Sequence, residues 1–161
     1  MNIRVATIHD LANIEKLARE IWPGTYGQIL SPDQIEYMLQ LFYSQTSLEK
    51  QMLQEHHQFL LVEWEEQPVG FADYSLYAPG VYKLHKIYVH ASMQGKGLGK
   101  ALICYVINKV KGHTLRLNVN RYNKARYFYE KLGFVITSQE DIDIGNGYYM
   151  NDYVMEITPA P

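Results

Sequence analysis

The chain has 161 residues, 47% of them hydrophobic and 20% charged, which is typical of one globular domain and not of a disordered or fibrous protein. Its net charge is -2, so it lacks the overall positive charge of a nucleic-acid-binding protein. The single cysteine, Cys104, excludes an intrachain disulfide and is typical of a reducing, cytoplasmic setting. No apolar run reaches the roughly 18 residues of a membrane span, and Met1 to Asp10 lack the pattern of a secretory signal, so we expect neither.

Capping patterns predict where the first helices begin and end. Thr7 followed by Asp10 resembles a capping box, and apolar residues continue at helical spacing as far as Ile21. Trp22-Pro23-Gly24 predicts the end of this helix, because proline lacks the N–H that a helix interior needs. Ser31-Pro32-Asp33-Gln34 predicts the start of the next helix, with Ser31 as its N-cap.

The rest of the chain predicts a mixed α/β fold with one strand–helix–strand crossover around a glycine-rich loop. Gly133 is expected to end a helix in a left-handed conformation, and Gly145-Asn146-Gly147 to form a turn. The predicted elements are a strand at 2–6, helices from 7 and from 31, a short helix at about 46–55, strands at 59–64, 69–77 and 82–89, a helix after the loop, a strand at 114–119, a helix at 123–132, and strands at 134–137 and 148–157.

The glycine-rich loop predicts a phosphate site. Gly95, Gly97 and Gly99 lie between a predicted strand and a predicted helix, where backbone N–H groups and the helix dipole favour an anion. Lys96 and Lys100 add positive charge. A pyrophosphate is therefore the expected ligand, and the alternative is a glycine-rich connection that binds nothing.

The spacing excludes two common phosphate-binding loops. A P-loop needs Ser or Thr after its lysine, but Lys100 is followed by Ala101. The dinucleotide fingerprint needs a third glycine that is absent here. The pattern present is Q-x-x-G-x-G, formed by Gln94, Gly97 and Gly99.

This loop resembles the acetyl-CoA pyrophosphate motif of the Gcn5-related N-acetyltransferases, or GNAT family. Residues 123–134 are similar to a second segment of that family, which ends in F-Y-x-x-x-G-F, and the strand at 84–89 also matches. The Trp22 to Tyr26 turn, the helix start at Ser31 and the tyrosine-rich C-terminal hairpin resemble the PaiA-like polyamine acetyltransferases. The resemblance implies one domain over residues 1–161, with a mostly antiparallel central sheet, flanking helices and splayed central strands.

The resemblance also implies that acetyl-CoA is the co-substrate. Its pantetheine arm is expected to pair with the strand edge at Ile87 to Val89, with the Val89 N–H as oxyanion donor. Asn123 resembles the family's pantetheine contact, although asparagine is also a common N-cap and both roles can hold. The implied binding residues are Ile87, Tyr88, Val89, Gln94, Gly95, Lys96, Gly97, Leu98, Gly99, Lys100, Asn123 and Tyr129.

Two residues are expected to handle protons. Tyr129 matches the family's tyrosine that hydrogen-bonds the thioester sulfur, so the resemblance implies a general acid; the alternative is a core aromatic residue. His85 precedes the loop, where a related polyamine group carries Glu, and it suits a general base. Its alternative is a partly buried structural histidine. No histidine pair is spaced to share a helical face, so we expect no metal site.

Trp22, Tyr26 and Tyr37 are expected to offer ring faces to a cationic amine. A collective acidic contribution is expected from Glu36, Glu140, Asp141, Asp143 and Asp152, although each alone reads as a solvated surface group. We expect Cys104 to be a buried small hydrophobe and not an acetyl carrier, so transfer is direct in a ternary complex.

The predicted function is acetyl transfer from acetyl-CoA to a primary amine of a small acceptor, with a polyamine as one candidate. The alternatives are an acetyltransferase acting on protein or peptide amines, which an open acidic groove would favour, and a non-catalytic acyl-CoA-binding regulatory module. The expected partner is a small amine, with no nucleic acid or membrane, and a homodimer is left open.

Overall fold

The computed structural model describes residues 1–161, which form two compact units. Unit 1 comprises Met1–Ser75 and His85–Val106, and unit 2 comprises Leu76–Leu84 and Ile107–Pro161. The strands β3 (Gln67–Ala78) and β4 (Val81–Val89) and the helix α4 (Leu98–Lys109) each have residues in both units. The elements are β1 (Asn2–Val5), α1 (Leu11–Tyr26), α2 (Pro32–Tyr43), α3 (Gln45–Leu53), β2 (Gln58–Trp64), β3 (Gln67–Ala78), β4 (Val81–Val89), α4 (Leu98–Lys109), β5 (Thr114–Asn120), α5 (Ala125–Lys131), β6 (Val135–Gly145) and β7 (Tyr148–Ile157), with short 3-10 helices at Ile8–Asp10 and Ala91–Met93.

The strands form a seven-stranded sheet in the order β1-β2-β3-β4-β5-β7-β6. Its ladders include the antiparallel pairs β1–β2 and β2–β3 in unit 1 and β5–β7 and β6–β7 in unit 2. β4 and β5 are parallel and are joined by the predicted crossover through α4. Their register ends at Leu84 opposite Leu117, although β4 continues to Val89 and β5 to Asn120. The mixed, mostly antiparallel sheet with flanking helices is the fold that the sequence predicted.

In unit 1, α1, α2 and α3 contact one another. The predicted capping box is present: the Thr7 hydroxyl accepts from the His9 N–H, and Asp10 Oδ2 accepts from the Thr7 N–H at 2.8 Å. Arg4 donates two further hydrogen bonds to this carboxylate, and they hold the pKa of Asp10 below its ordinary value against the opposing effect of burial. Ser31 caps α2, as predicted, by accepting from the Gln34 N–H.

The predicted end of α1 is wrong, because the helix passes through Pro23 and ends at Tyr26. Proline removes only its own N–H, and its carbonyl still accepts from the Gly27 N–H at 2.9 Å. Pro23 is exposed, so its ring needs no room inside the core. Trp22 and Tyr26 therefore share the last turns of one helix instead of lying in a turn.

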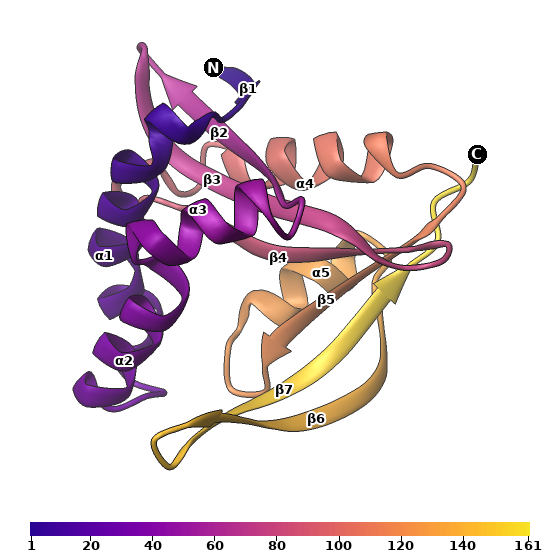
Figure 1. The fold of residues 1–161 in the computed structure, drawn as a ribbon. Helices are drawn as coiled ribbons and strands as arrows, with labels where there is room; N and C mark the ends of the chain where they lie inside the picture. The colour runs from indigo at the N-terminus through magenta and orange to yellow at the C-terminus, as the bar shows by residue number, and fades with distance from the viewer. The chain divides into compact units, whose positions relative to one another are not determined.

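In unit 2, β6 is much longer than the predicted strand at 134–137 and forms a long hairpin with β7 (Figure 1). Most of its residues are exposed, so the strand carries little of the alternating apolar pattern that predicts a strand. The turn prediction is confirmed, with positive φ at Gly145, Asn146 and Gly147. Gly133 also has positive φ, as predicted for the end of α5. The apolar core of this unit includes Leu115, Leu117, Phe134, Val154 and Met155.

Candidate functional site

The glycine loop prepares the N-terminus of α4 for an anion. Gly95 and Gly97 have φ of +80° and +79°, a conformation that residues with a side chain rarely adopt, and a Cβ at either position would meet no atom within 4 Å. Gly97 O accepts from the Ala101 N–H at 3.0 Å and so begins the helix. The first N–H groups of a helix have no acceptor within it. The loop therefore offers backbone donors at a place where the helix dipole favours negative charge.

The loop is connected to the end of β4. The Gln94 side chain donates to the Val89 carbonyl at 3.4 Å. Position 70 on β3 requires glycine, which the sequence did not lead us to expect. A Cβ at Gly70 would lie 2.7 Å from the Tyr88 carbonyl oxygen and 3.2 Å from Val89 Cα. Only glycine lets β3 approach this part of β4 so closely. β5 does not pair with residues 87–89 of β4. The β4–β5 ladder therefore leaves unused the part of β4 that is predicted to hydrogen-bond with pantetheine.

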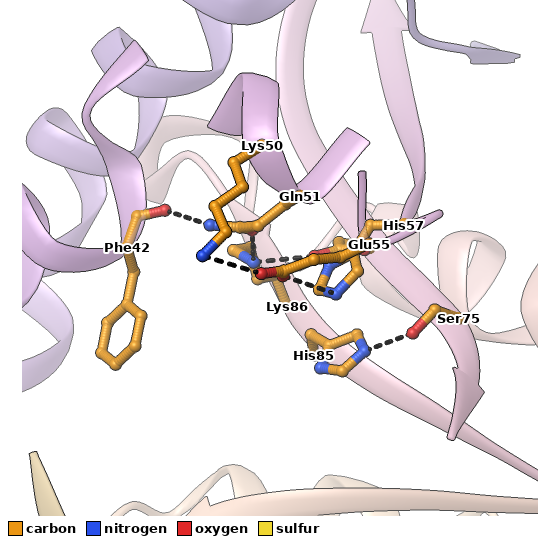
Figure 2. Close-up of polar contacts among 9 residues, drawn as sticks. Phe42, Lys50, Gln51, Glu55, His57, Ser75, His85 and Lys86 are labelled. Carbon is orange, nitrogen blue, oxygen red and sulfur yellow. Dashed lines mark hydrogen bonds and ion pairs between the residues drawn. The ribbon is translucent and has the colours of Figure 1, made fainter. Parts of the chain in front are cut away.

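His85 lies on β4 in unit 1, where its Nε2 shares a 2.7 Å hydrogen bond with the Ser75 hydroxyl (Figure 2). Its ring stacks on the His57 ring, with centroids 4.1 Å apart and an interplanar angle of 12°. His57 Nδ1 is in turn 2.7 Å from Asp73 Oδ2. His85 is thus held between a hydroxyl and a second imidazole that is bound to a carboxylate.

Asp73 is fully buried and binds two groups through one oxygen. Its Oδ2 accepts from Lys86 Nζ at 2.7 Å as well as contacting His57. Lys86 Nζ also donates to Gln51 Oε1 at 2.5 Å, and Gln51 donates to the Phe42 carbonyl (Figure 2). Burial opposes ionisation of Asp73, but the Lys86 charge and the His57 hydrogen bond outweigh it and lower the pKa of this carboxyl. Asp73 is therefore an ionised acceptor at neutral pH.

The predicted acceptor-binding aromatics differ in exposure. Trp22 is buried, and its ring packs on Tyr26 at 4.6 Å, on Tyr43 at 5.5 Å and on Tyr88 at 5.9 Å between centroids. Tyr26 and Tyr37 are partly buried, and the Tyr26 and Tyr88 hydroxyls share a 2.7 Å hydrogen bond. Trp22 thus supports the ring of Tyr26, and contact of these residues with an acceptor stays a prediction.

The predicted residues of unit 2 are Asn123 and Tyr129. Asn123 Oδ1 accepts from the Ala125 N–H at 2.9 Å and so closes a turn just before α5, but the N-cap of this helix is Lys124, which makes no side-chain cap, so Asn123 is not the predicted N-cap. Tyr129 on α5 is 8% exposed and packs edge-on against Phe128 and Phe134. Its packing role is therefore real, and its role as an acid stays a prediction.

Two expectations about polar residues are wrong. Cys104 is exposed, because the buried face of α4 is formed by Leu98, Leu102, Ile103 and Val106. Asp152 on β7 is buried and not a solvated surface acid, and this burial raises the pKa of its carboxyl. The other acidic residues are exposed, as expected: Glu36, Glu140, Asp141 and Asp143.

None of the helices has both the length and the apolar character that crossing a membrane would need.

Comparison with known proteins identifies the family. An acetyltransferase (GNAT) domain model matches residues 28–157. A curated spermidine N(1)-acetyltransferase of Thermoplasma acidophilum is 30% identical in a 164-residue alignment that covers 97% of this chain and 96% of that protein. The chain belongs to the GNAT acetyltransferase family.

Solved structures agree with this assignment. A PaiA N-acetyltransferase of Thermoplasma acidophilum, crystallised with coenzyme A, has a TM-score of 0.81 and 28% identity, and the match covers 98% of this chain and 99% of that one. A GCN5-related N-acetyltransferase of Rhodopseudomonas palustris shares the fold, with a TM-score of 0.82 at 20% identity over 98% of this chain and 94% of that one. The chain is therefore an enzyme with the GNAT fold, and its resemblance to PaiA is confirmed.

In this acetyltransferase, sequence reasoning missed the residues that surround His85. His57, Asp73 and Gln51 follow no motif, and they meet only because the loop before β2, the strand β3 and the helix α3 come together. One signal was available: Asp73 and Lys86 are charged residues within runs that otherwise predict buried strands. Buried charges are rare unless they are paired, so such positions predict a buried ion pair.

Proposed function

We propose that this GNAT enzyme transfers the acetyl group of acetyl-CoA to a primary amine of a small polycationic acceptor of the polyamine class. The observation that carries the proposal is the likeness to a spermidine N(1)-acetyltransferase over 97% of this chain and 96% of that protein. The coenzyme A in the PaiA crystal structure supports the choice of donor. The match to L-amino acid N-acyltransferase MnaT of Escherichia coli covers only 34% of this chain, and the match to peptidyl-lysine N-acetyltransferase YjaB of Salmonella typhimurium covers 52%.

Residues 95–100 would hold the pyrophosphate of acetyl-CoA through their backbone N–H groups. The positive φ at Gly95 and Gly97 and the start of α4 at Leu98 support this assignment. Ile87 to Val89 would pair with the pantetheine amides, because the β5 ladder does not use this part of β4. Asn123 would add a contact through its side-chain amide, whose Oδ1 also accepts from the Ala125 N–H.

The chemistry requires that the acceptor nitrogen lose two protons and that the leaving thiolate gain one. His85 removes a proton from the acceptor ammonium, directly or through a water, because an alkylamine of pKa ~10 is mostly protonated at neutral pH. The amine nitrogen then bonds to the thioester carbonyl carbon, and the Val89 N–H stabilises the oxyanion. The C–S bond breaks, and the Tyr129 hydroxyl gives its proton to the leaving thiolate. The nitrogen still carries one proton more than the product amide and releases it to solvent. His85 and Tyr129 are restored by exchange with solvent.

The acceptor is tested by acetyl-CoA turnover with spermidine, spermine, amino acids, an aminoglycoside and lysine peptides. We expect the highest kcat/KM with the polyamines. A higher value with the peptides would replace the proposal by a protein acetyltransferase. Acetyl-CoA binding without turnover of any amine would indicate a regulatory module.

The base is tested by the His85→Gln variant, which keeps a polar side chain without a basic ring. Its kcat/KM should fall most near neutral pH and recover at high pH, where the free amine is abundant. His9→Gln is the control, because His9 is exposed and lies in the short 3-10 helix Ile8–Asp10 and not on β4. A wild-type pH profile for His85→Gln would remove His85 from the mechanism.

A further inference from the structure

A tryptophan at the tip of the β2–β3 hairpin contacts the glycine loop. The Lys96 ammonium lies 5.2 Å from the centroid of the Trp64 ring, within the range of a cation–π contact. Lys96 stands between Gly95 and Gly97 and is exposed, whereas Trp64 is half-buried at the end of β2. Lys96 forms no ion pair, so its charge interacts with this ring and not with a carboxylate of the protein.

A tight turn places the Trp64 ring beside the loop. Trp64 pairs with Gln67 across a two-residue connection in which Glu65 and Glu66 have positive φ, 49° and 64°. Positive φ at both central residues is typical of the type I′ turn, whose twist matches that of the flanking strands. A two-residue turn of this kind leaves the end of β2 little freedom to move. The ring is therefore held in one position by the backbone that carries it.

The same hairpin also binds the chain just before the glycine loop. The Val69 carbonyl accepts from the His90 N–H at 2.8 Å, one residue after β4 ends. Gly70, the next residue on β3, is the position at which the two strands approach most closely. The hairpin thus contacts the segment between β4 and α4 at two points, at His90 through a hydrogen bond and at Lys96 through the Trp64 ring.

A second point of attachment matters because a glycine-rich backbone is costly to order. Glycine loses more conformational freedom on folding than any other residue, and Gly95 and Gly97 flank Lys96. A loop that is ordered before its ligand arrives spares the ligand part of that entropic cost. We propose that Trp64 is a positioning residue for acetyl-CoA, whose ring holds Lys96 and so keeps the pyrophosphate loop in its binding conformation. This inference rests on the proposed binding of the pyrophosphate by residues 95–100.

Lys96 could instead serve binding by pairing its ammonium directly with a phosphate. The two roles predict opposite effects when the ring is removed. If Trp64 orders the loop, loss of the ring weakens acetyl-CoA binding. If the ring only competes with the phosphate for the ammonium, its loss strengthens binding.

A double-mutant cycle in the full chain tests the proposal. Trp64→Leu removes the ring, and Lys96→Met removes the charge from a side chain of similar length. Each variant should raise the Kd for acetyl-CoA by about threefold, the size expected for an exposed cation–π contact. The double variant should bind about as weakly as either single variant. Because the effect is on binding, KM for acetyl-CoA should rise while kcat stays near wild type.

Two conservative variants serve as matched controls. Lys96→Arg keeps a cation for the ring and should bind acetyl-CoA nearly as well as wild type. Trp64→Phe keeps a ring that attracts cations less strongly, so it should fold and show a smaller loss than Trp64→Leu. Additive losses in the cycle, an unchanged Kd in both Trp64 variants, or tighter binding by them would each overturn the proposal.

NMR of the free protein separates this inference from the proposed function. The Lys96 side-chain protons next to the ammonium should be shifted upfield by the ring current of the indole, and Trp64→Leu should abolish this shift. Absence of the upfield shift in the wild type would contradict the inference directly. If the shift is present but Gly97→Asp keeps its acetyl-CoA affinity, the proposed pyrophosphate site fails, and the role of Trp64 in binding fails with it.

Discussion

Tyr129 has both a structural and a proposed chemical role, and these roles reside in different parts of the side chain. Its ring packs between Phe128 and Phe134 in unit 2, with centroids 5.4 and 5.8 Å away. Its hydroxyl is the part that could protonate a thiolate. Phenylalanine keeps the ring and its packing, so replacing Tyr129 by phenylalanine tests the chemical role of the hydroxyl.

Tyr129→Phe should lower kcat by about 10²-fold, at the low end for loss of a general acid, because thiolate is already a tolerable leaving group. Acetyl-CoA affinity should stay near wild type. The checks are steady-state kinetics, direct binding and thermal unfolding of the purified variant. Tyr122→Phe is a matched control, because Tyr122 is 77% exposed.

Full activity of Tyr129→Phe would leave Tyr129 with packing alone. Cys104→Ala should be nearly silent in the same assay, since Cys104 is exposed and no acetyl-cysteine intermediate is expected. A large loss there, in a folded variant, would reopen a covalent route.

At the residue scale, the sequence predicted a residue's conformation correctly where a local motif determines the backbone geometry. Gly95 and Gly97 adopt the positive φ that glycine favours. Sequence reasoning failed for His57, whose contacts with Asp73 and His85 join segments that are far apart in the sequence. Contacts between side chains from different elements produce no periodic pattern in the sequence, so only the structure could show them.

At the scale of elements, the predicted acetyl-CoA pyrophosphate site in the loop before α4 can be tested by comparing two glycine positions. Gly97 has φ of +79° with no atom near its missing Cβ, and Gly147 in the β6–β7 turn has the same φ and equally open space. An aspartate therefore meets the same backbone strain at both positions, about 1 kcal/mol. Any further difference between the two variants comes from what the loop binds.

Gly97→Asp should weaken acetyl-CoA binding by at least tenfold, because it places a negative side chain beside the proposed phosphate site. Gly147→Asp should lose comparable stability and keep its acetyl-CoA affinity. Isothermal titration calorimetry and urea unfolding measure the two effects. Equal affinities in the two folded variants would show that the loop does not hold the pyrophosphate.

Element boundaries were predictable where a cap or turn had its own residue pattern. Thr7 and Ser31 begin helical segments as expected, and Gly145 to Gly147 turn the chain. The predicted end of α1 at Pro23 was wrong because a proline inside a helix removes one hydrogen bond and does not have to end the helix. Burial of the apolar face of α1 stabilises the helix in spite of that loss. Most of β6 was not predicted, because this strand is stabilised by its hydrogen bonds to β7 and has few buried residues that would give an apolar pattern.

At the scale of the whole molecule, buried carboxylates set how stability depends on pH, and they act in opposite directions. The pKa of Asp73 is lowered, so its stabilising effect is present above its unfolded value of about 3.9 and is lost as pH falls through the folded pKa. Asp10 acts in the same sense. The pKa of Asp152 is raised by burial, so its ionisation costs stability as pH rises from that unfolded value through the folded one.

Asp152→Asn should therefore stabilise the protein, and the gain should depend on pH. The Asn118 amide donates to Asp152 Oδ2 at 3.2 Å, and an asparagine can keep that acceptor without burying a charge beside Glu140, which also accepts from Asn118. The free energy of unfolding in urea should exceed wild type at pH 7, and the two proteins should converge near pH 3, where Asp152 is protonated in both the folded and unfolded states. Glu49→Gln, at an exposed position on α3, is the control and should show no comparable gain. A pH-independent difference for Asp152→Asn would mean that packing, and not the buried charge, decides its effect.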